Sequence, residues 1–225
     1  ADAYTINSEP ILSIDLMERA SKAFVNWFVK KFPLSSNEMI SVICGKGNNG
    51  GDGMSIARQL VDRSYDVAVF VLDLSDKTAE DFKTNLERVN QLKDLGKISL
   101  KYVNSVEEMP VFGEEEILID AILGSGLSRP VVDDMADILR FLNECRNTMI
   151  AVDIPTGVFS DMPTTGTCIK ADYTFAFEFP KLSFFFPENY HCVGNFVYES
   201  IGLNQKFIDS ADSPYFYITA DYVKD

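Results

Sequence analysis

One stretch of sequence decides the fold: Val42-Ile43-Cys44-Gly45-Lys46-Gly47-Asn48-Asn49-Gly50-Gly51-Asp52-Gly53. An apolar run over residues 39–44 ends in a loop with five glycines, and a helical pattern begins after it, at about Met54. Glycine lets the backbone approach a ligand closely, and a helix N-terminus presents unpaired N–H groups to an anion. The stretch therefore predicts a strand, a phosphate-binding loop and a helix, in that order.

Residues 45–50 also fit the G-x-G-x-x-G fingerprint of dinucleotide-binding proteins. Two features differ from an ordinary dehydrogenase. Asp52 places a carboxylate where it would repel a pyrophosphate, and the amide oxygens of Asn48 and Asn49 are of the kind that hard cations prefer. We therefore expect a loop for phosphate together with a metal ion or a polar group. The alternative is a tight turn without a ligand, although a turn needs fewer glycines.

The composition excludes several classes of protein. The chain has 225 residues, a net charge of −14 and a pI near 4.5, which argue against a nucleic-acid partner. No apolar run approaches the roughly 20 residues of a membrane span, and the first residues lack a secretory signal pattern. Cys44, Cys145, Cys168 and Cys192 show no C-x-x-C spacing. We expect a cytoplasmic protein without a membrane partner, with four reduced thiols and neither a disulfide framework nor a zinc site.

Strand and helix patterns alternate along the chain. Helices are expected over residues 13–32 with Ser13 as the N-cap, 54–63, 78–95 and 132–143, and strands over 39–44, 67–72, 99–103, 117–120, 149–152, 173–177, 196–201 and 215–218. The alternation predicts a three-layer α/β/α Rossmann-like fold with a mostly parallel sheet, as one domain over residues 1–225.

Three loops follow strand ends: the glycine loop, residues 120–130 and residues 153–157. Ligands bind at the carboxyl ends of the strands in this architecture, so the loops are expected to form one pocket. The aspartates gathered there would raise one another's pKa unless a cation or a role in proton transfer relieved the repulsion. Asp73, at the end of the second strand, fits the acidic position that holds ribose hydroxyls, and a loop-capping role is the alternative.

The chain resembles the NAD(P)H-hydrate epimerases, which stand alone or form the N-terminal domain of bifunctional NAD(P)HX epimerase/dehydratases. Three ordered motifs carry the resemblance: G-x-G-N-N-G-G-D-G at 45–53, D-A-I-L-G-S-G at 120–126 and D-I-P-T-G at 153–157. Weaker similarity at other positions, among them Pro180-Lys181, extends it over about residues 13–202.

The resemblance implies an isomerase that interconverts the R and S epimers of hydrated NADH and NADPH (NADHX and NADPHX) in nicotinamide nucleotide repair. It also implies a potassium ion as cofactor, an ADP- or ATP-dependent dehydratase as a fused or separate partner, and a homodimer. The abrupt ending over residues 219–225 leads us to expect a domain excised from a longer bifunctional chain.

The resemblance further assigns the site residues. Asp153 is the catalytic residue and contacts the substrate. The other substrate-binding residues are Asn48, Asn49, Gly50, Gly51, Asp52, Gly124, Ser125, Gly126, Leu127, Ser128, Arg129 and Pro130, and the potassium ligands are Asn49, Asp120 and Thr156. Some relatives carry a lysine near Ser128 and Arg129. Its absence here leaves open whether Arg129, a phosphate or amide clamp, takes its place.

Two other functions compete with epimerisation. An NAD-dependent oxidoreductase would explain G-x-G-x-x-G together with Asp73. A non-catalytic nucleotide-binding or protein-interaction module of the same fold would explain the motifs without chemistry. The presence of Asn49, Asp52, Asp120 and Asp153 together favours a working site over a relic.

Overall fold

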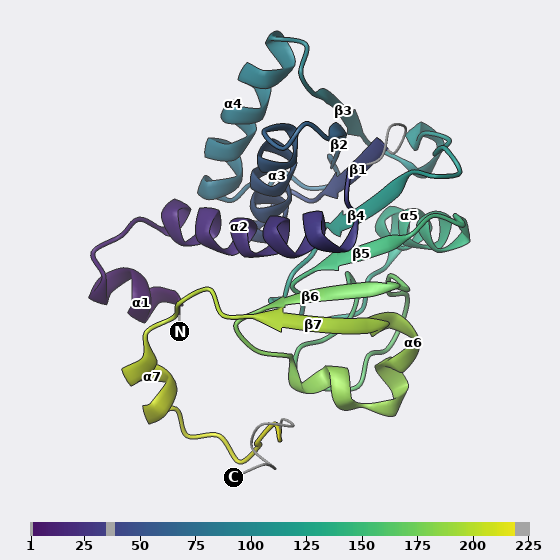
Figure 1. Ribbon diagram of the computed structural model, residues 1–225. Coiled ribbons are helices and arrows are strands. Elements are labelled where there is room, and N and C mark those ends of the chain that lie inside the picture. Colours follow the sequence, from purple (N-terminus) through teal and green to yellow (C-terminus); the bar gives the residue numbers. More distant parts are fainter. Residues whose placement is uncertain (1, 35–38, 219–225) are drawn as a thin grey trace.

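The computed structural model describes residues 2–34 and 39–218, and the chain ending on which we based the expectation of an excised domain lies outside them. It contains a seven-stranded sheet in the order β3-β2-β1-β4-β5-β6-β7, in which every neighbouring pair is parallel (Figure 1). The strands are β1 (Met39–Cys44), β2 (Asp66–Leu72), β3 (Ser99–Val103), β4 (Ile117–Ala121), β5 (Met149–Val152), β6 (Tyr173–Phe177) and β7 (Asn195–Glu199). The predicted Rossmann-like class is confirmed.

Helices cover both faces of the sheet (Figure 1). They are α1 (Asp2–Ser8), α2 (Ser13–Lys31), α3 (Asn48–Val61), α4 (Glu80–Asp94), α5 (Asp133–Glu144), α6 (Tyr190–Val193) and α7 (Gln205–Ser210). Helices α2, α3 and α4 pack on one face, whereas α5 packs on the other. Among the described residues, no helix combines the length and apolarity that crossing a membrane requires.

Period-two alternation in β1 builds both layers of the core. Ile40, Val42 and Cys44 face the cluster formed with α2 and α3, whereas Ile43 faces the cluster formed with α5. All four side chains are fully buried, which is typical of a central strand in a parallel sheet. The run of apolar residues therefore fixes β1 at the centre of the sheet, where its carboxyl end supports the glycine-rich segment.

Helix α2 packs on one face of the sheet through its aromatic side chains. Phe24 and Phe28 are completely buried, and the ring of Phe24 meets that of Phe175 on β6 at a centroid distance of 5.4 Å. Such edge-to-face pairs add about 0.5–1.5 kcal/mol to the stabilisation from burial alone. This packing holds the N-terminal end of α2 beside the ends of the central strands, where it contributes to the cavity described below.

Several helix and strand boundaries in the structure differ from the predicted ones. Helix α3 begins at Asn48 instead of Met54, because its glycines are required by close packing and do not interrupt the helix. Ser13 is the first helical residue and not the cap, and its hydroxyl donates to Asp81 at 2.6 Å. The predicted strand over 215–218 is wrong, since these residues form no strand and Tyr217 instead packs on Phe185.

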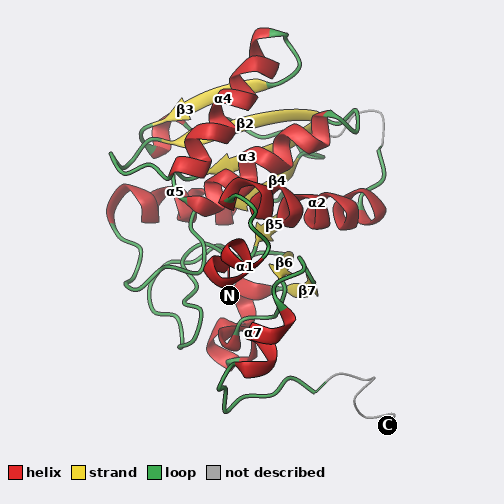
Figure 2. Ribbon diagram, turned by 90° about the vertical axis from the view of Figure 1, so that its left-hand side faces the viewer, coloured by secondary structure: helices red, strands yellow, loops and turns green. Residues whose placement is uncertain are grey.

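Helices α1 and α7 were not predicted, and the two lie beside one another (Figure 2). The rings of Tyr4 and Phe207 are 5.2 Å apart, and the Asn204 backbone N–H donates to the Thr5 hydroxyl at 2.9 Å. Each helix is short and buries little apolar surface, so neither carries a strong periodic signal in the sequence. Contacts between the two ends of the chain therefore stabilise α1 and α7.

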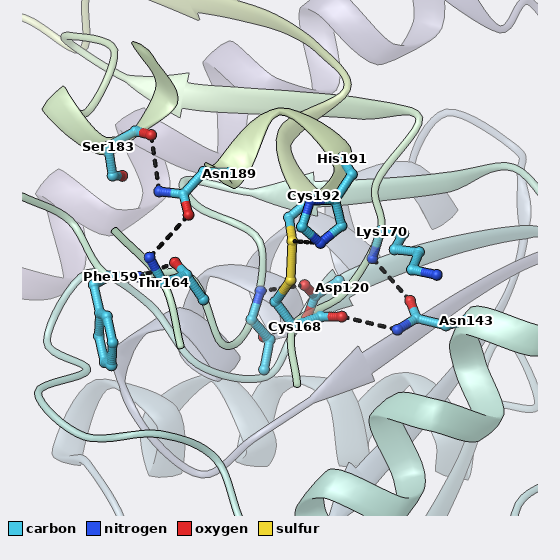
Figure 3. The surroundings of a disulfide bond; sticks show 11 residues. Asp120, Asn143, Phe159, Thr164, Cys168, Lys170, Ser183, Asn189, His191 and Cys192 are labelled. Carbon is cyan, nitrogen blue, oxygen red and sulfur yellow. Dashed lines mark hydrogen bonds between the residues drawn. A yellow bond between two sulfur atoms is a disulfide. The ribbon is translucent and has the colours of Figure 1, made fainter. Parts of the chain in front are cut away.

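Cys168 and Cys192 form a disulfide, which corrects the expectation of four reduced thiols (Figure 3). Their Cα atoms lie 6.4 Å apart although they are 24 positions apart in the sequence. The Nε2 atom of His191 lies 3.3 Å from the sulfur of Cys192. Cys44 and Cys145 are free thiols. The pairing was missed because neither cysteine lies in a spacing motif; the fold alone brings α6 against the segment that precedes β6.

Candidate active site

A cavity of about 770 Å³ lies at the carboxyl ends of the central strands. The strand order reverses between β1 and β4, the point where parallel sheets of this kind usually bind ligands. Segments from all three predicted loops line the cavity, and α1, the first turns of α2 and the residues after β6 close its other sides. The sheet topology therefore brings together three motifs that are far apart in the sequence.

The glycine-rich segment forms the first turns of α3, and its backbone fits tightly against the sheet. A Cβ atom on Gly50 would lie 1.7 Å from the Gly45 carbonyl oxygen, so any larger residue at position 50 would collide with the end of β1. The Asn85 side chain donates to the Gly51 carbonyl at 3.3 Å. Neighbouring helices thus hold the N-terminal turn of α3 in place, with its free N–H groups directed toward the cavity end of the helix.

The predicted substrate-binding residues divide into two groups. Those that line the cavity are Asn48, Asn49, Asp52, Gly124, Ser125, Gly126, Leu127 and Asp153. Gly50 and Gly51 are buried behind the cavity wall, and Ser128, Arg129 and Pro130 are exposed outside it. The Arg129 side chain therefore does not contribute to the cavity in this structure.

Asp120 and Thr156 form a fully buried pair beneath the cavity floor. The Thr156 hydroxyl donates to Oδ1 of Asp120 at 2.6 Å, and the Thr156 backbone N–H donates to Oδ2 at 2.7 Å. Burial raises the pKa of Asp120 from its ordinary value of 3.8 to about 6, against the opposing effect of these hydrogen bonds. The carboxylate is therefore costly to keep charged in this position without a cation nearby.

The oxygen atoms at the cavity floor are suitable ligands for a hard cation. Asn49 is buried against Gly124, where a Cβ atom on the glycine would lie 3.2 Å from the Asn49 Cβ. Within the described residues its Nδ2 atom has no hydrogen-bond partner, although it is buried. Amide, carboxylate and hydroxyl oxygens are the ligands that such cations prefer. Oδ1 of Asp120 already accepts from the Thr156 hydroxyl and the Ile122 backbone N–H, whereas Oδ2 accepts one hydrogen bond, from the Thr156 backbone N–H, and retains a lone pair for a cation. The residues present thus fit a bound cation.

Asp153 follows β5 directly and has a left-handed backbone, with φ of 66°. Asn and Asp tolerate this conformation better than most residues, and such outliers cluster at functional sites. Its Oδ1 atom accepts a hydrogen bond from the Phe177 backbone N–H at 3.1 Å and forms an ion pair with the Lys181 ammonium at 2.6 Å. The fold therefore determines the direction of the carboxylate at the cavity wall.

Carboxylates dominate the charge of the cavity. Burial raises the pKa of Asp52 well above its ordinary value, and the negative charges of Asp153, Asp2 and Asp81 raise it further. Asp52 thus tends to retain its proton, whereas Asp153 has a cationic partner. The cavity thus holds two carboxyl groups in different environments.

The positions of one acidic and one basic residue differ from what the sequence predicted. Asp73 forms an ion pair with Lys46 and does not line the cavity, so it does not occupy the predicted ribose-binding role here. Lys181 lines the cavity but was not assigned to the site. The Pro180-Lys181 pair was noticed only as a point of family similarity, and that similarity was the one signal that could have identified it.

Comparisons with known proteins identify the family of this chain. The family model described as "YjeF-related protein N-terminus" matches residues 13–183. The NAD(P)H-hydrate epimerase of Oenococcus oeni is 32% identical over 182 residues, which cover 80% of this chain and 82% of the relative. The bifunctional NAD(P)H-hydrate repair enzyme Nnr of Moorella thermoacetica is 31% identical over 204 residues, or 88% of this chain, and the match spans only 38% of the relative's length.

The crystal structure of yeast ynu0 has a similar fold. It superimposes with a TM-score of 0.69 and 23% sequence identity over 92% of this chain and 88% of the yeast chain. The likeness supports the α/β architecture.

Proposed function

The chain belongs to the family of YjeF-related N-terminal domains, and on that premise we propose that it is an isomerase that interconverts the R and S epimers of NADHX and NADPHX. The observation that carries the proposal is the cavity that gathers Asn48, Asp52 and Asp153 above the buried Asp120–Thr156 pair. A dinucleotide needs a phosphate site and an acid–base group within one cleft, and this cavity provides both.

The chemistry follows from the bonds at C6 of the hydrated ring. Protonation of the C6 hydroxyl lets it leave as water, and the adjacent ring nitrogen stabilises the resulting cation. Water then adds to the opposite face and releases a proton, which yields the other epimer. The reaction therefore requires a proton donor, a proton acceptor and a negative charge near the cation.

We assign these requirements to two carboxyl groups. Asp52, whose pKa is raised, supplies the proton to the departing hydroxyl. Asp153 stabilises the cation through its charge and accepts the proton from the incoming water. Transfer of that proton back to Asp52 through cavity water restores the starting state. Asp153 is thus the central acid–base residue of the proposed mechanism.

We propose that Asn49, Asp120 and Thr156 hold a potassium ion, which when bound supplies positive charge beside the substrate phosphates. Because cation ligands must be deprotonated and the pKa of Asp120 is about 6, potassium should bind at pH 8 and dissociate at pH 5. Thermal unfolding in potassium chloride and in choline chloride measures this without any assay of activity. A potassium-dependent rise in the melting temperature that is equal at both pH values would contradict the assignment.

The remaining biological context is also a proposal. The fusion in the Moorella thermoacetica relative suggests that an ADP- or ATP-dependent dehydratase, on the same chain or separate, consumes the S epimer. We expect a homodimer, and we place the protein in the cytoplasm on the family resemblance. Cys168 and Cys192 are paired, so the cysteines do not support that compartment.

The decisive test uses a mixture of R- and S-NADHX with a separately purified dehydratase that consumes only S. The chain should accelerate the disappearance of R well beyond its spontaneous rate. The variant Asp153→Asn should fold normally, because Asn tolerates the same backbone, and should lose about 10²- to 10⁴-fold in rate. Folded wild-type protein that gives no acceleration would favour the non-catalytic module, and hydride transfer with plain NAD would favour an oxidoreductase.

A further inference from the structure

The cavity contains one positively charged side chain among the described residues that line it. Its acidic lining residues are Asp2, Asp52, Asp81, Asp153 and Glu178, and its basic one is Lys181. The exposed Arg129 lies outside this lining. Any role that requires an ammonium or guanidinium group at this wall therefore falls to Lys181.

The contact between Lys181 and Asp153 is specific to one oxygen. The ammonium lies 2.6 Å from Oδ1 of Asp153, and the Phe177 backbone N–H donates to the same oxygen at 3.1 Å. The exposed fractions of the two side chains are only 18% and 14%, so water competes weakly for the pair. With Oδ1 engaged by two donors, Oδ2 is the oxygen left to a molecule in the cavity.

Lys181 is held in place by its own surroundings and is not a mobile surface lysine. Its ammonium also donates to the Phe177 carbonyl at 3.3 Å. Its backbone carbonyl accepts from Phe184 at 3.0 Å, and the next turn is tied to the loop after β5 by a bond from Ser183 to Ser160 at 3.1 Å. The segment over residues 181–184 thus brings one ammonium group to the carboxylate that follows β5.

We propose that Lys181 is a positioning residue for epimerisation: it fixes Oδ1 of Asp153 so that Oδ2 faces the reacting carbon. This inference rests on the proposed function and deepens it. A carboxylate fixed on one side needs less reorganisation when the ring cation forms, which is the condition for strong electrostatic stabilisation. Lys181 acts through Asp153 and not through the substrate phosphates.

The test is a double-mutant cycle in the coupled assay with R- and S-NADHX. Lys181→Met should lower kcat about 10- to 100-fold with little change in KM, and Lys181→Arg should recover part of the loss because a guanidinium can reach the same oxygen. In an Asp153→Asn background, Lys181→Met should change kcat less than twofold. Lys170→Met, an exposed lysine at the opposite edge of the sheet, serves as the matched control and should leave kcat unchanged.

The outcomes distinguish a positioning role for Lys181 from a role as a phosphate clamp. Losses that multiply in the double variant would overturn the positioning role, as would a rise in KM at constant kcat, which would identify Lys181 as a phosphate clamp. If Lys181→Met does not fold, Lys181→Arg in the two backgrounds completes the cycle. An inactive wild type would refute the proposed function and this inference together, whereas an active wild type with independent effects refutes this inference alone.

Discussion

Substitution of Thr156 by valine isolates the buried pair that forms the cavity floor. Valine retains the shape of threonine but removes the hydroxyl, which donates to Asp120 at 2.6 Å and accepts from the Leu123 backbone N–H at 3.0 Å. Thr156 and Asp120 are fully buried, so water cannot replace either contact. The variant therefore tests how much of the local stability depends on one oxygen atom.

The two lost contacts set the magnitude. A hydrogen bond to a charged group contributes about 1.5–3 kcal/mol, and an unsatisfied buried N–H costs about 1–3 kcal/mol. Because the contacts share one oxygen and the site can relax, we expect Thr156→Val to reduce the free energy of unfolding by about 3 kcal/mol at pH 8.

The pH dependence follows from the pKa of Asp120. This pKa is raised in the folded state from 3.8 to about 6, so the folded chain binds the proton more tightly than the unfolded chain and loses stability as pH rises through that window. The Thr156 hydroxyl lowers the folded-state pKa. Without it the pKa rises further, and the variant keeps losing stability above pH 6. The difference from wild type should therefore be smaller at pH 5, by about 1 kcal/mol for a bond that becomes neutral.

Urea denaturation in choline chloride at pH 5 and pH 8 measures both values without potassium. The matched control is Thr174→Val, another fully buried threonine, whose hydroxyl donates at 2.7 Å to the Val193 carbonyl and not to a carboxylate. This control should lose about 1 kcal/mol at both pH values. Equal destabilisation of Thr156→Val at the two pH values, or the same pH dependence in Thr174→Val, would refute the reasoning.

Two further predictions concern the backbone and the disulfide. Gly50→Ala should destabilise the chain by more than about 3 kcal/mol in urea denaturation, because its Cβ would lie 1.7 Å from the Gly45 carbonyl oxygen. Gly47→Ala, with no atom within 4 Å of the new Cβ, should cost less than about 1 kcal/mol in the same measurement. Reduction of Cys168–Cys192, whose loop spans 24 residues, should lower the free energy of unfolding by about 3 kcal/mol; an unchanged melting temperature with dithiothreitol, after thiol titration shows full reduction, would contradict it.

Local patterns in the sequence were sufficient for the α/β class and for most of the elements. The apolar run at β1 and the amphipathic spacing of α2 depend on neighbouring residues only, so their periodicity survives in the sequence. The ordered motifs also predicted which loops would meet, because parallel strands place their carboxyl ends along one edge. The helix start at Asn48 was missed because glycine ordinarily disfavours a helix, and only the contact between Gly50 and the end of β1 explains why it is needed.

The remaining features depend on contacts between segments that are distant in the sequence. The chain alone indicated Asp153 as an acid–base candidate, but only the fold brings the ammonium of Lys181 and the Phe177 backbone N–H to one of its carboxylate oxygens. In the same way, only the packing of α6 brings Cys192 to Cys168, and only burial beside Thr156 raises the pKa of Asp120 to about 6. The sequence by itself determined which chemical groups are available and near which strand ends. Tertiary structure decided their partners, orientation and charge, because dielectric environment and side-chain geometry are set by neighbours that no local pattern specifies.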